Sequence, residues 1–116
     1  MSVRVGLVQV NNEFSGVTYL PLSVADLQSY ASGHLENPPW YEFFVPVYKR
    51  IPMDEAVARL RGADIAGFSL YVWNRNYSLE LARRLKQISP STLVVFGGPE
   101  VPDRSEEFLR NHRSVD

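Results

Sequence analysis

Two loops hold the residues whose types and spacing are suited to binding a ligand. The loop Ser69-Leu-Tyr-Val-Trp-Asn74 joins a hydroxyl, two large aromatic rings and a carboxamide. The loop Gly97-Gly-Pro-Glu100 opens with paired glycines, which either let a ligand pass close to the backbone or simply form a tight turn. Aromatic rings in a loop pack either on a large, flat ligand or on a neighbouring protein surface, and the residues leave both interpretations open.

A third loop and two histidines give weaker indications of a functional site than these two loops. Asn11, Asn12 and Ser15 follow the first apolar segment and are suited either to binding a ligand or to forming a turn. This loop lacks the Gly-x-Gly-x-x-Gly pattern of dinucleotide sites. His34 and His112 fall near helix ends without the partners of a metal cluster or a catalytic triad. The sequence therefore predicts a binding domain with no catalytic residue and no protein-held metal.

Strands and helices alternate along the chain. Apolar, β-branched runs predict strands over 3–10, 40–48, 64–69 and 91–96, the last of them in the centre of the sheet, and Pro46 places the second at an edge. Helical periodicity predicts helices over 20–35, 52–61 and 76–89, and a last helix that Asp103 or Ser105 would cap. The first helix is expected to bury one face, made of Leu20, Val24, Leu27, Ala31 and Leu35.

This order predicts an α/β fold, a three-layer α/β/α sandwich with a parallel, Rossmann-like or flavodoxin-like sheet of four to five strands. Both ligand-type loops would then follow the carboxyl ends of neighbouring strands, where open parallel sheets bind ligands.

Composition excludes several classes of function. The chain has 116 residues, enough for one domain, and its net charge of -1 gives no basic field for nucleic acid. It contains no cysteine, which excludes disulfides and thiolate ligands from its own residues. No signal peptide or membrane-spanning run is visible, so we expect a cytoplasmic domain without a membrane partner.

The two principal loops and the segments after them resemble the N-terminal cobalamin-binding domain of cobalamin-dependent radical SAM enzymes. The segments that carry the resemblance are 68–74, 76–86, 92–101, 106–112 and 115–116. The resemblance implies that residues 1–116 are an N-terminal piece of a longer enzyme, foremost a methyltransferase. A radical SAM barrel, with S-adenosylmethionine and a cysteine-bound iron–sulfur cluster, would lie beyond residue 116.

In cobalamin domains a serine loop and a later Gly-Gly loop hold the nucleotide tail of the cofactor, and Ser69 and Gly97-Gly98 match these places. The family's Asp-x-His-x-x-Gly segment reads Asn11-Asn-Glu-Phe-Ser-Gly16 here, without the Asp and the His. The resemblance therefore implies base-off cobalamin without a histidine ligand, its lower face covered by the loop 71–74. The candidate cofactor-binding residues are Asn11, Asn12, Ser69, Leu70, Tyr71, Val72, Trp73, Asn74, Gly97, Gly98, Pro99 and Glu100. The alternative is a degenerate flavodoxin-like domain that serves as a structural or interaction module without a cofactor.

Overall fold

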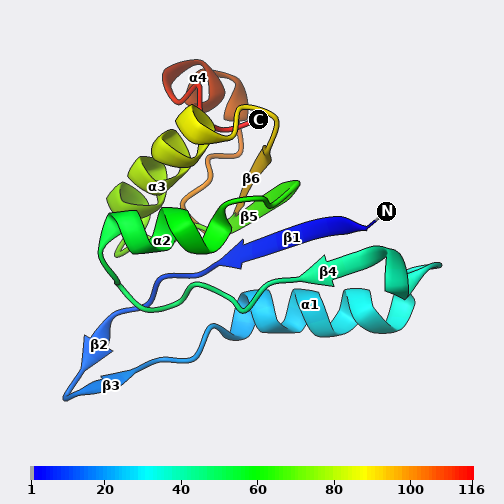
Figure 1. The fold of residues 1–116 in the computed structure, drawn as a ribbon. Coiled ribbons are helices and arrows are strands. Elements are labelled where there is room, and N and C mark those ends of the chain that lie inside the picture. Colours follow the sequence, from blue (N-terminus) through cyan, green and yellow to red (C-terminus); the bar gives the residue numbers. More distant parts are fainter. Residues whose placement is uncertain (1) are drawn as a thin grey trace.

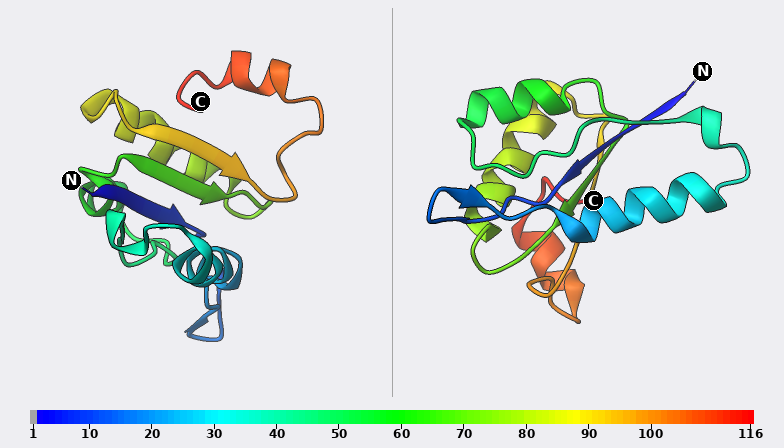
Figure 2. Two further views of the ribbon diagram at one scale, coloured as in Figure 1. Left: turned by 90° about the vertical axis from the view of Figure 1, so that its right-hand side faces the viewer. Right: turned by 90° about the horizontal axis from the view of Figure 1, so that it is seen from below.

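The centre of the fold is a parallel sheet. A computed structural model describes residues 2–116 and places the strands β1 (Val3–Val8), β4 (Tyr41–Phe43), β5 (Ile65–Ser69) and β6 (Leu93–Gly97) in the order β4-β1-β5-β6 (Figure 1). Helix α1 (Leu22–His34) lies on one face of this sheet, and α2 (Met53–Leu60) and α3 (Arg75–Ile88) lie on the other (Figures 1 and 2). The predicted three-layer α/β fold is confirmed.

The main core fills the space between the sheet and α2 and α3. Alternate strand residues point to this side, as the period of two requires, and meet the apolar stripes of the two amphipathic helices. Its fully buried members include Val8, Ala66 and Val94 from the strands and Leu60, Leu81 and Leu85 from the helices.

The opposite face is only partly covered, and here the prediction for the first helix is wrong. Val24 of α1 is buried against Val5 and Leu7 of β1, but Leu27 is 63% exposed and Leu20 lies outside the helix. The reason is tertiary, because α1 packs on β1 and comes near β5 but does not cover β6. Leu93 and Val95, on this bare side of β6, are each 46% exposed.

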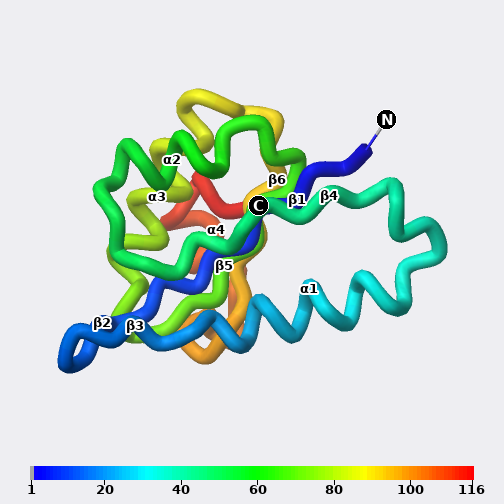
Figure 3. The backbone as a smooth tube through the Cα atoms, turned by 60° about the horizontal axis from the view of Figure 1, so that its bottom comes forward, coloured from blue at the N-terminus to red at the C-terminus, as the bar shows by residue number. Residues whose placement is uncertain are grey.

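Residues 11–16 form more than the predicted loop. They contribute to a hairpin of two two-residue strands, β2 (Glu13–Phe14) and β3 (Val17–Thr18). Ser15 and Gly16 make the turn with positive φ angles of 52° and 77°, a geometry that suits a two-residue hairpin loop. The hairpin projects from the body of the domain (Figures 1 and 3).

Both edge strands differ from their predictions. The predicted strand 40–48 is β4, of three residues, preceded by the short helical turn η1 (Pro38–Trp40). Its edge position is confirmed, and it is interrupted near Pro46, which has no N–H to donate, before Val47 bridges to Val8. Strand β6, predicted to be central, forms the other edge among residues 2–116.

The last residues of the chain pack beside β6. Helix α4 (Ser105–Asn111) packs Phe108 against Phe96, and no side chain caps its N-terminus, so the predicted capping is wrong. The Asp116 amide donates to the Val94 carbonyl at 2.9 Å, and the Asp116 carboxylate accepts from the Val94 amide at 2.8 Å and from Lys86 Nζ at 2.5 Å. Burial raises the pKa of this carboxyl, but the hydrogen bonds from Lys86 and Val94 outweigh it and leave the pKa below its usual value.

Among the helices of the described chain, none has the length and apolarity needed to cross a bilayer.

Candidate functional site

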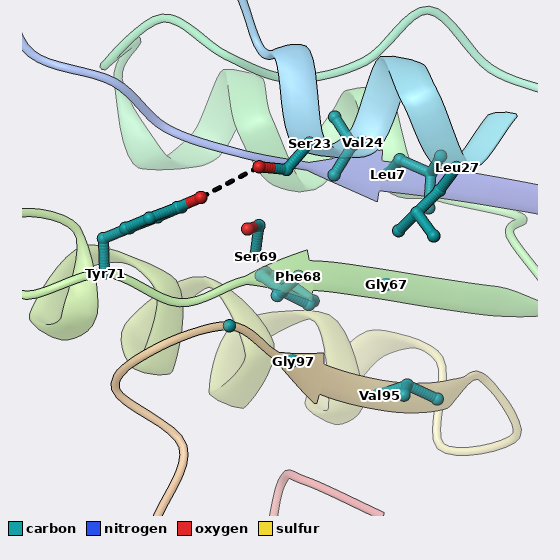
Figure 4. Close-up of a pocket in the computed structure, with 11 residues that line it drawn as sticks. Leu7, Ser23, Val24, Leu27, Gly67, Phe68, Ser69, Tyr71, Val95 and Gly97 are labelled. Carbon is teal, nitrogen blue, oxygen red and sulfur yellow. Dashed lines mark hydrogen bonds between the residues drawn. The ribbon is translucent and has the colours of Figure 1, made fainter. Parts of the chain in front are cut away.

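A cavity of about 390 Å³ lies where α1 leaves the sheet uncovered (Figure 4). We call it cavity 1. Its walls are apolar side chains from α1 and the strands, and Ser23, Ser69 and Tyr71 gather at the end nearest the carboxyl edge (Figure 4). The apolar side chains are those of Leu7, Val24, Leu27 and Val95, and Phe68 also lines the cavity although its ring belongs to the main core. This volume falls within the range of small-molecule pockets.

The floor of cavity 1 is backbone without side chains. Gly67 of β5 and Gly97 of β6 both line it, and they lie on paired strands. A Cβ atom built on Gly97 would meet no heavy atom within 4 Å, and one on Gly67 would lie 3.0 Å from a Leu7 methyl group. The chain itself therefore does not require glycine at position 97, and the missing side chain leaves space in the cavity.

Gly98 differs from Gly97. Its φ is +104°, and a Cβ there would lie 2.7 Å from the carbonyl oxygen of Leu70. The same loops are joined by hydrogen bonds from the Leu70 amide to the Gly97 carbonyl at 2.7 Å and from the Glu100 amide to the Leu70 carbonyl at 3.2 Å. Gly98 is thus needed for the close approach of the two loops, whatever ligand lies beside them.

A second cavity, cavity 2, lies beside the first on the same edge of the sheet and measures about 500 Å³. Its lining includes Asn11 and Asn12 from the first loop and Tyr71 and Trp73 from the aromatic loop. The rings of Tyr71 and Trp73 stack with centroids 4.5 Å apart, and the Tyr71 and Ser23 hydroxyls share a hydrogen bond of 2.8 Å. Figure 4 shows this hydroxyl pair. Because Ser23 and Tyr71 line both cavities, the pair stands at the boundary between them.

Asn74 determines the shape of the aromatic loop. Its side chain is fully buried, and its Oδ1 accepts from the Tyr71 amide at 2.9 Å. Its Nδ2 donates to the carbonyls of Val10 and Ser69, each at 3.0 Å. In this conformation every polar atom of the Asn74 side chain binds backbone, so it holds the loop rather than facing a ligand.

The first loop is organised in the same way. Asn11 is 6% exposed, and its Nδ2 donates to the carbonyls of Tyr19 and Leu20 at 3.0 and 3.1 Å. These bonds close the base of the β2–β3 hairpin. The Nδ2 group of Asn11 is therefore committed to the fold, although the residue lines cavity 2.

The structure divides the twelve predicted residues into groups. Cavity 1 is lined by Ser69, Tyr71, Gly97 and Gly98, and cavity 2 by Asn11, Asn12, Tyr71 and Trp73. Leu70 and Asn74 are buried beneath these loops, and Val72 is 71% exposed. Pro99 and Glu100 line neither cavity.

Sequence reasoning missed the walls that α1 and the strand faces supply. Ser23 and Leu27 come from α1, and Val95 lies two residues before Gly97 on the same face of β6. The period of two along a strand would have paired Val95 with Gly97. No signal in the sequence would have revealed that α1 leaves this face open.

The ionisable groups whose pKa values are clearly shifted line neither cavity 1 nor cavity 2. Hydrogen bonds from Arg83 and Arg84 lower the pKa of Glu80 on the surface of α3 to about 2. Burial raises the pKa of the Tyr77 hydroxyl, and the nearby Arg50 opposes this effect. Within residues 2–116, no three His, Asp or Glu side chains come together as a metal site. The polar side chains that line the two cavities are uncharged hydroxyls, carboxamides and an indole.

Comparison with known proteins agrees with this geometry. A family model described as the B12 binding domain matches residues 45–116. The chain belongs to this family. The match begins just after β4 and runs past α4 to residue 116, and it contains both principal loops of the B12-binding domain.

Two curated relatives extend the match to most of the B12-binding domain described here. The 2-(S-pantetheinyl)-carbapenam-3-carboxylate methyltransferase of Streptantibioticus cattleyicolor is 36% identical over 102 residues, which are 88% of this chain and 15% of that protein. The cobalamin-dependent radical SAM methyltransferase TokK of Streptomyces tokunonensis is 36% identical over 98 residues, 84% of this chain and 14% of that protein. The chain thus spans about one seventh of the length of these relatives.

Proposed function

We propose that this chain is the cobalamin-binding module of a radical SAM methyltransferase, and that it holds cobalamin base-off without a histidine ligand. In the base-off form the nucleotide base of the cofactor does not coordinate cobalt. The observation that carries the proposal is cavity 1. Its floor at Gly97 is open, and because the protein's own packing has room for a larger residue at this position, a ligand in the cavity explains the glycine.

Cavity 1 fits the nucleotide tail of cobalamin, which is a flat aromatic base on a ribose phosphate. The apolar walls and the glycine floor suit the flat base, because a planar ring can lie directly against bare backbone. The hydroxyls of Ser23, Ser69 and Tyr71 at the end of the cavity suit the oxygens of the sugar and the phosphate, since hydroxyls both donate and accept hydrogen bonds. We therefore propose Ser69 and Gly97 as contacts of the nucleotide tail, as the sequence predicted, and add Ser23 to them.

The edge of the sheet above cavity 1 suits the corrin ring. The stacked rings of Tyr71 and Trp73 offer a flat apolar surface there, and Asn12 offers an exposed amide. His34 is the last residue of α1 and His112 follows α4, and neither lines cavity 1 or cavity 2. This placement supports a cofactor held without a histidine ligand, whose lower face the loop 71–74 would cover.

The chemistry divides between cofactor and protein. Cobalamin, when bound, supplies a cobalt centre able to carry a methyl group. The residues of this chain would bind the tail, orient the ring and keep water from its lower face. We propose residues 1–116 as the N-terminal module of a longer enzyme. The barrel of that enzyme would use S-adenosylmethionine and supply the cysteines of an iron–sulfur cluster, because this chain has none.

The test is to fill cavity 1 from its floor. Gly97→Leu places a side chain in the open space, and Gly97→Ala places a methyl group there. After incubation with hydroxocobalamin and desalting, we expect the unaltered chain to keep corrin absorbance, Gly97→Ala to keep part of it and Gly97→Leu to lose it. Leu93→Phe is the matched control, because Leu93 lies on the same strand and lines neither cavity.

Two outcomes would contradict the proposal. Equal retention by Gly97→Leu and the unaltered chain would show that the tail does not occupy cavity 1. Nitrogen superhyperfine splitting in the paramagnetic resonance spectrum of bound cob(II)alamin would show an axial nitrogen ligand and refute the base-off, histidine-free form.

A further inference from the structure

We infer that Arg50 is a positioning residue for the aromatic pair Tyr71–Trp73. Its Nη2 atom donates a hydrogen bond of 2.7 Å to the backbone carbonyl of Trp73. The role in cofactor binding rests on the proposed function, whereas the role in holding the loop does not.

Arg50 comes from a segment fixed to the sheet. The Gln9 and Asn11 amides, just past β1, donate to the carbonyls of Val47 and Tyr48, each at 2.9 Å. Arg50 therefore starts from an anchored backbone at the carboxyl end of β1 and reaches the loop that follows β5. Its hydrogen bond joins two loops that are distant in the sequence but adjacent at the carboxyl edge of the sheet, beside cavity 2.

The guanidinium group is itself held in place. It lies 5.4 Å from the centroid of the Tyr77 ring, and the Tyr77 hydroxyl donates to the Ile51 carbonyl at 2.7 Å. Among the described residues, no carboxylate lies within salt-bridge distance of Arg50. Its charge is thus directed to the Trp73 carbonyl and the Tyr77 ring, and a hydrogen bond from a charged donor is stronger than a neutral one.

Arg50 and Asn74 hold the loop from opposite ends. Asn74 binds the Tyr71 amide from within the fold, and Arg50 binds the Trp73 carbonyl from outside. Val72, between the two aromatic residues, is 71% exposed and adds little packing. Without Arg50, Asn74 would still close the turn and its amide would still donate to the Tyr71 carbonyl at 3.2 Å. The Trp73 carbonyl would lose its side-chain anchor, and we expect the Trp73 ring to be held less firmly in the stack.

The first test follows Trp73 without any cofactor. In a Trp40→Phe background, Trp73 is the sole tryptophan of the 116-residue chain. Acrylamide quenching of its fluorescence should rise in Arg50→Met by at most about 2.4-fold, the ratio between full exposure and its present 42%. Lys49→Met is the matched control, because it removes the adjacent charge, which lies over Tyr48, and should leave quenching unchanged.

The second test measures hydroxocobalamin affinity in the same variants. Loss of a charged hydrogen bond that orders the binding surface should weaken binding about tenfold in Arg50→Met. Arg50→Lys, which keeps the charge and one donor in reach, should recover part of both properties, and Lys49→Met should bind normally. A urea midpoint for each variant identifies any that is unfolded, and Arg50→Lys decides the question if Arg50→Met does not fold.

The outcomes separate this inference from the proposed function. If the unaltered chain binds no cobalamin but quenching rises only in the Arg50 variants, the positioning role stands and the proposed function fails. If cobalamin binds and neither quenching nor affinity changes in Arg50→Met, the positioning role is refuted. A lower urea midpoint with unchanged quenching and affinity would also refute it, because Arg50 would then serve stability alone.

Discussion

Asn74→Ala provides the sharpest test of how the aromatic loop is built. The Asn74 side chain is fully buried and makes three hydrogen bonds, to the Tyr71 amide and the Val10 and Ser69 carbonyls. Each such bond contributes about 0.5–1.5 kcal/mol net, and a buried group left without a partner costs about 1–3 kcal/mol. We therefore expect Asn74→Ala to lower the free energy of unfolding by about 3–4 kcal/mol, a large share of the roughly 5–15 kcal/mol of an ordinary domain.

The measurement is equilibrium urea unfolding followed by far-ultraviolet circular dichroism. The midpoint should fall while the slope with denaturant stays constant, since the variant exposes no additional surface. Asn76→Ala is the matched control, because Asn76 is exposed near the start of α3, and its effect should stay within about 0.5 kcal/mol. A loss below about 1 kcal/mol in Asn74→Ala would refute the view that this side chain holds the loop.

Three further predictions concern the two principal loops and the residues beside β6. Gly98→Ala should destabilise the chain by about 1–3 kcal/mol in urea unfolding, because the new methyl would lie 2.7 Å from the Leu70 carbonyl oxygen and φ is +104°; a neutral result would contradict this. Tyr71→Phe removes the 2.8 Å hydrogen bond to Ser23 and should cost about 0.5–1.5 kcal/mol, whereas a gain in stability would show that the bond is strained. Because the pKa of Asp116 is lowered in the folded state, its carboxylate contributes stability at pH values above the usual pKa of 3.8. This contribution is lost as the pH falls through the folded-state pKa. The urea midpoint should therefore fall less between pH 5 and 2 in Asp116→Asn than in the unaltered chain, and parallel curves would contradict the assignment.

The core elements were predictable because local patterns and tertiary packing agree there. The stripe of α3 and the alternation of β5 specify their own burial, since each presents one apolar face at its own period. The carboxyl ends of β5 and β6 meet because the strands are parallel and paired, so the two loops were expected to share one edge. Ser69 and Gly97 indeed lie opposite each other in the register.

The elements around the open face were not predictable in the same way. Leu27 has the spacing of a buried residue but faces cavity 1, because the burial of a helix face depends on what stands opposite it. Gly97 and Gly98 are identical in the sequence, yet a positive φ and the nearness of Leu70 make only Gly98 indispensable to the loop. No spacing rule connects Arg50 with Trp73, which are 23 residues apart.

The sequence by itself determined the alternation of strands and helices, the parallel sheet and the two loops at its edge, because these follow from local periodicity and chain direction. Tertiary structure alone decided which of those loop residues face a cavity and which hold the loop. Trp73 lines cavity 2 while Asn74, its neighbour, is fully buried. That difference depends on where Val10 and Ser69 present their carbonyls, and only the packing of β1 against β5 brings them together.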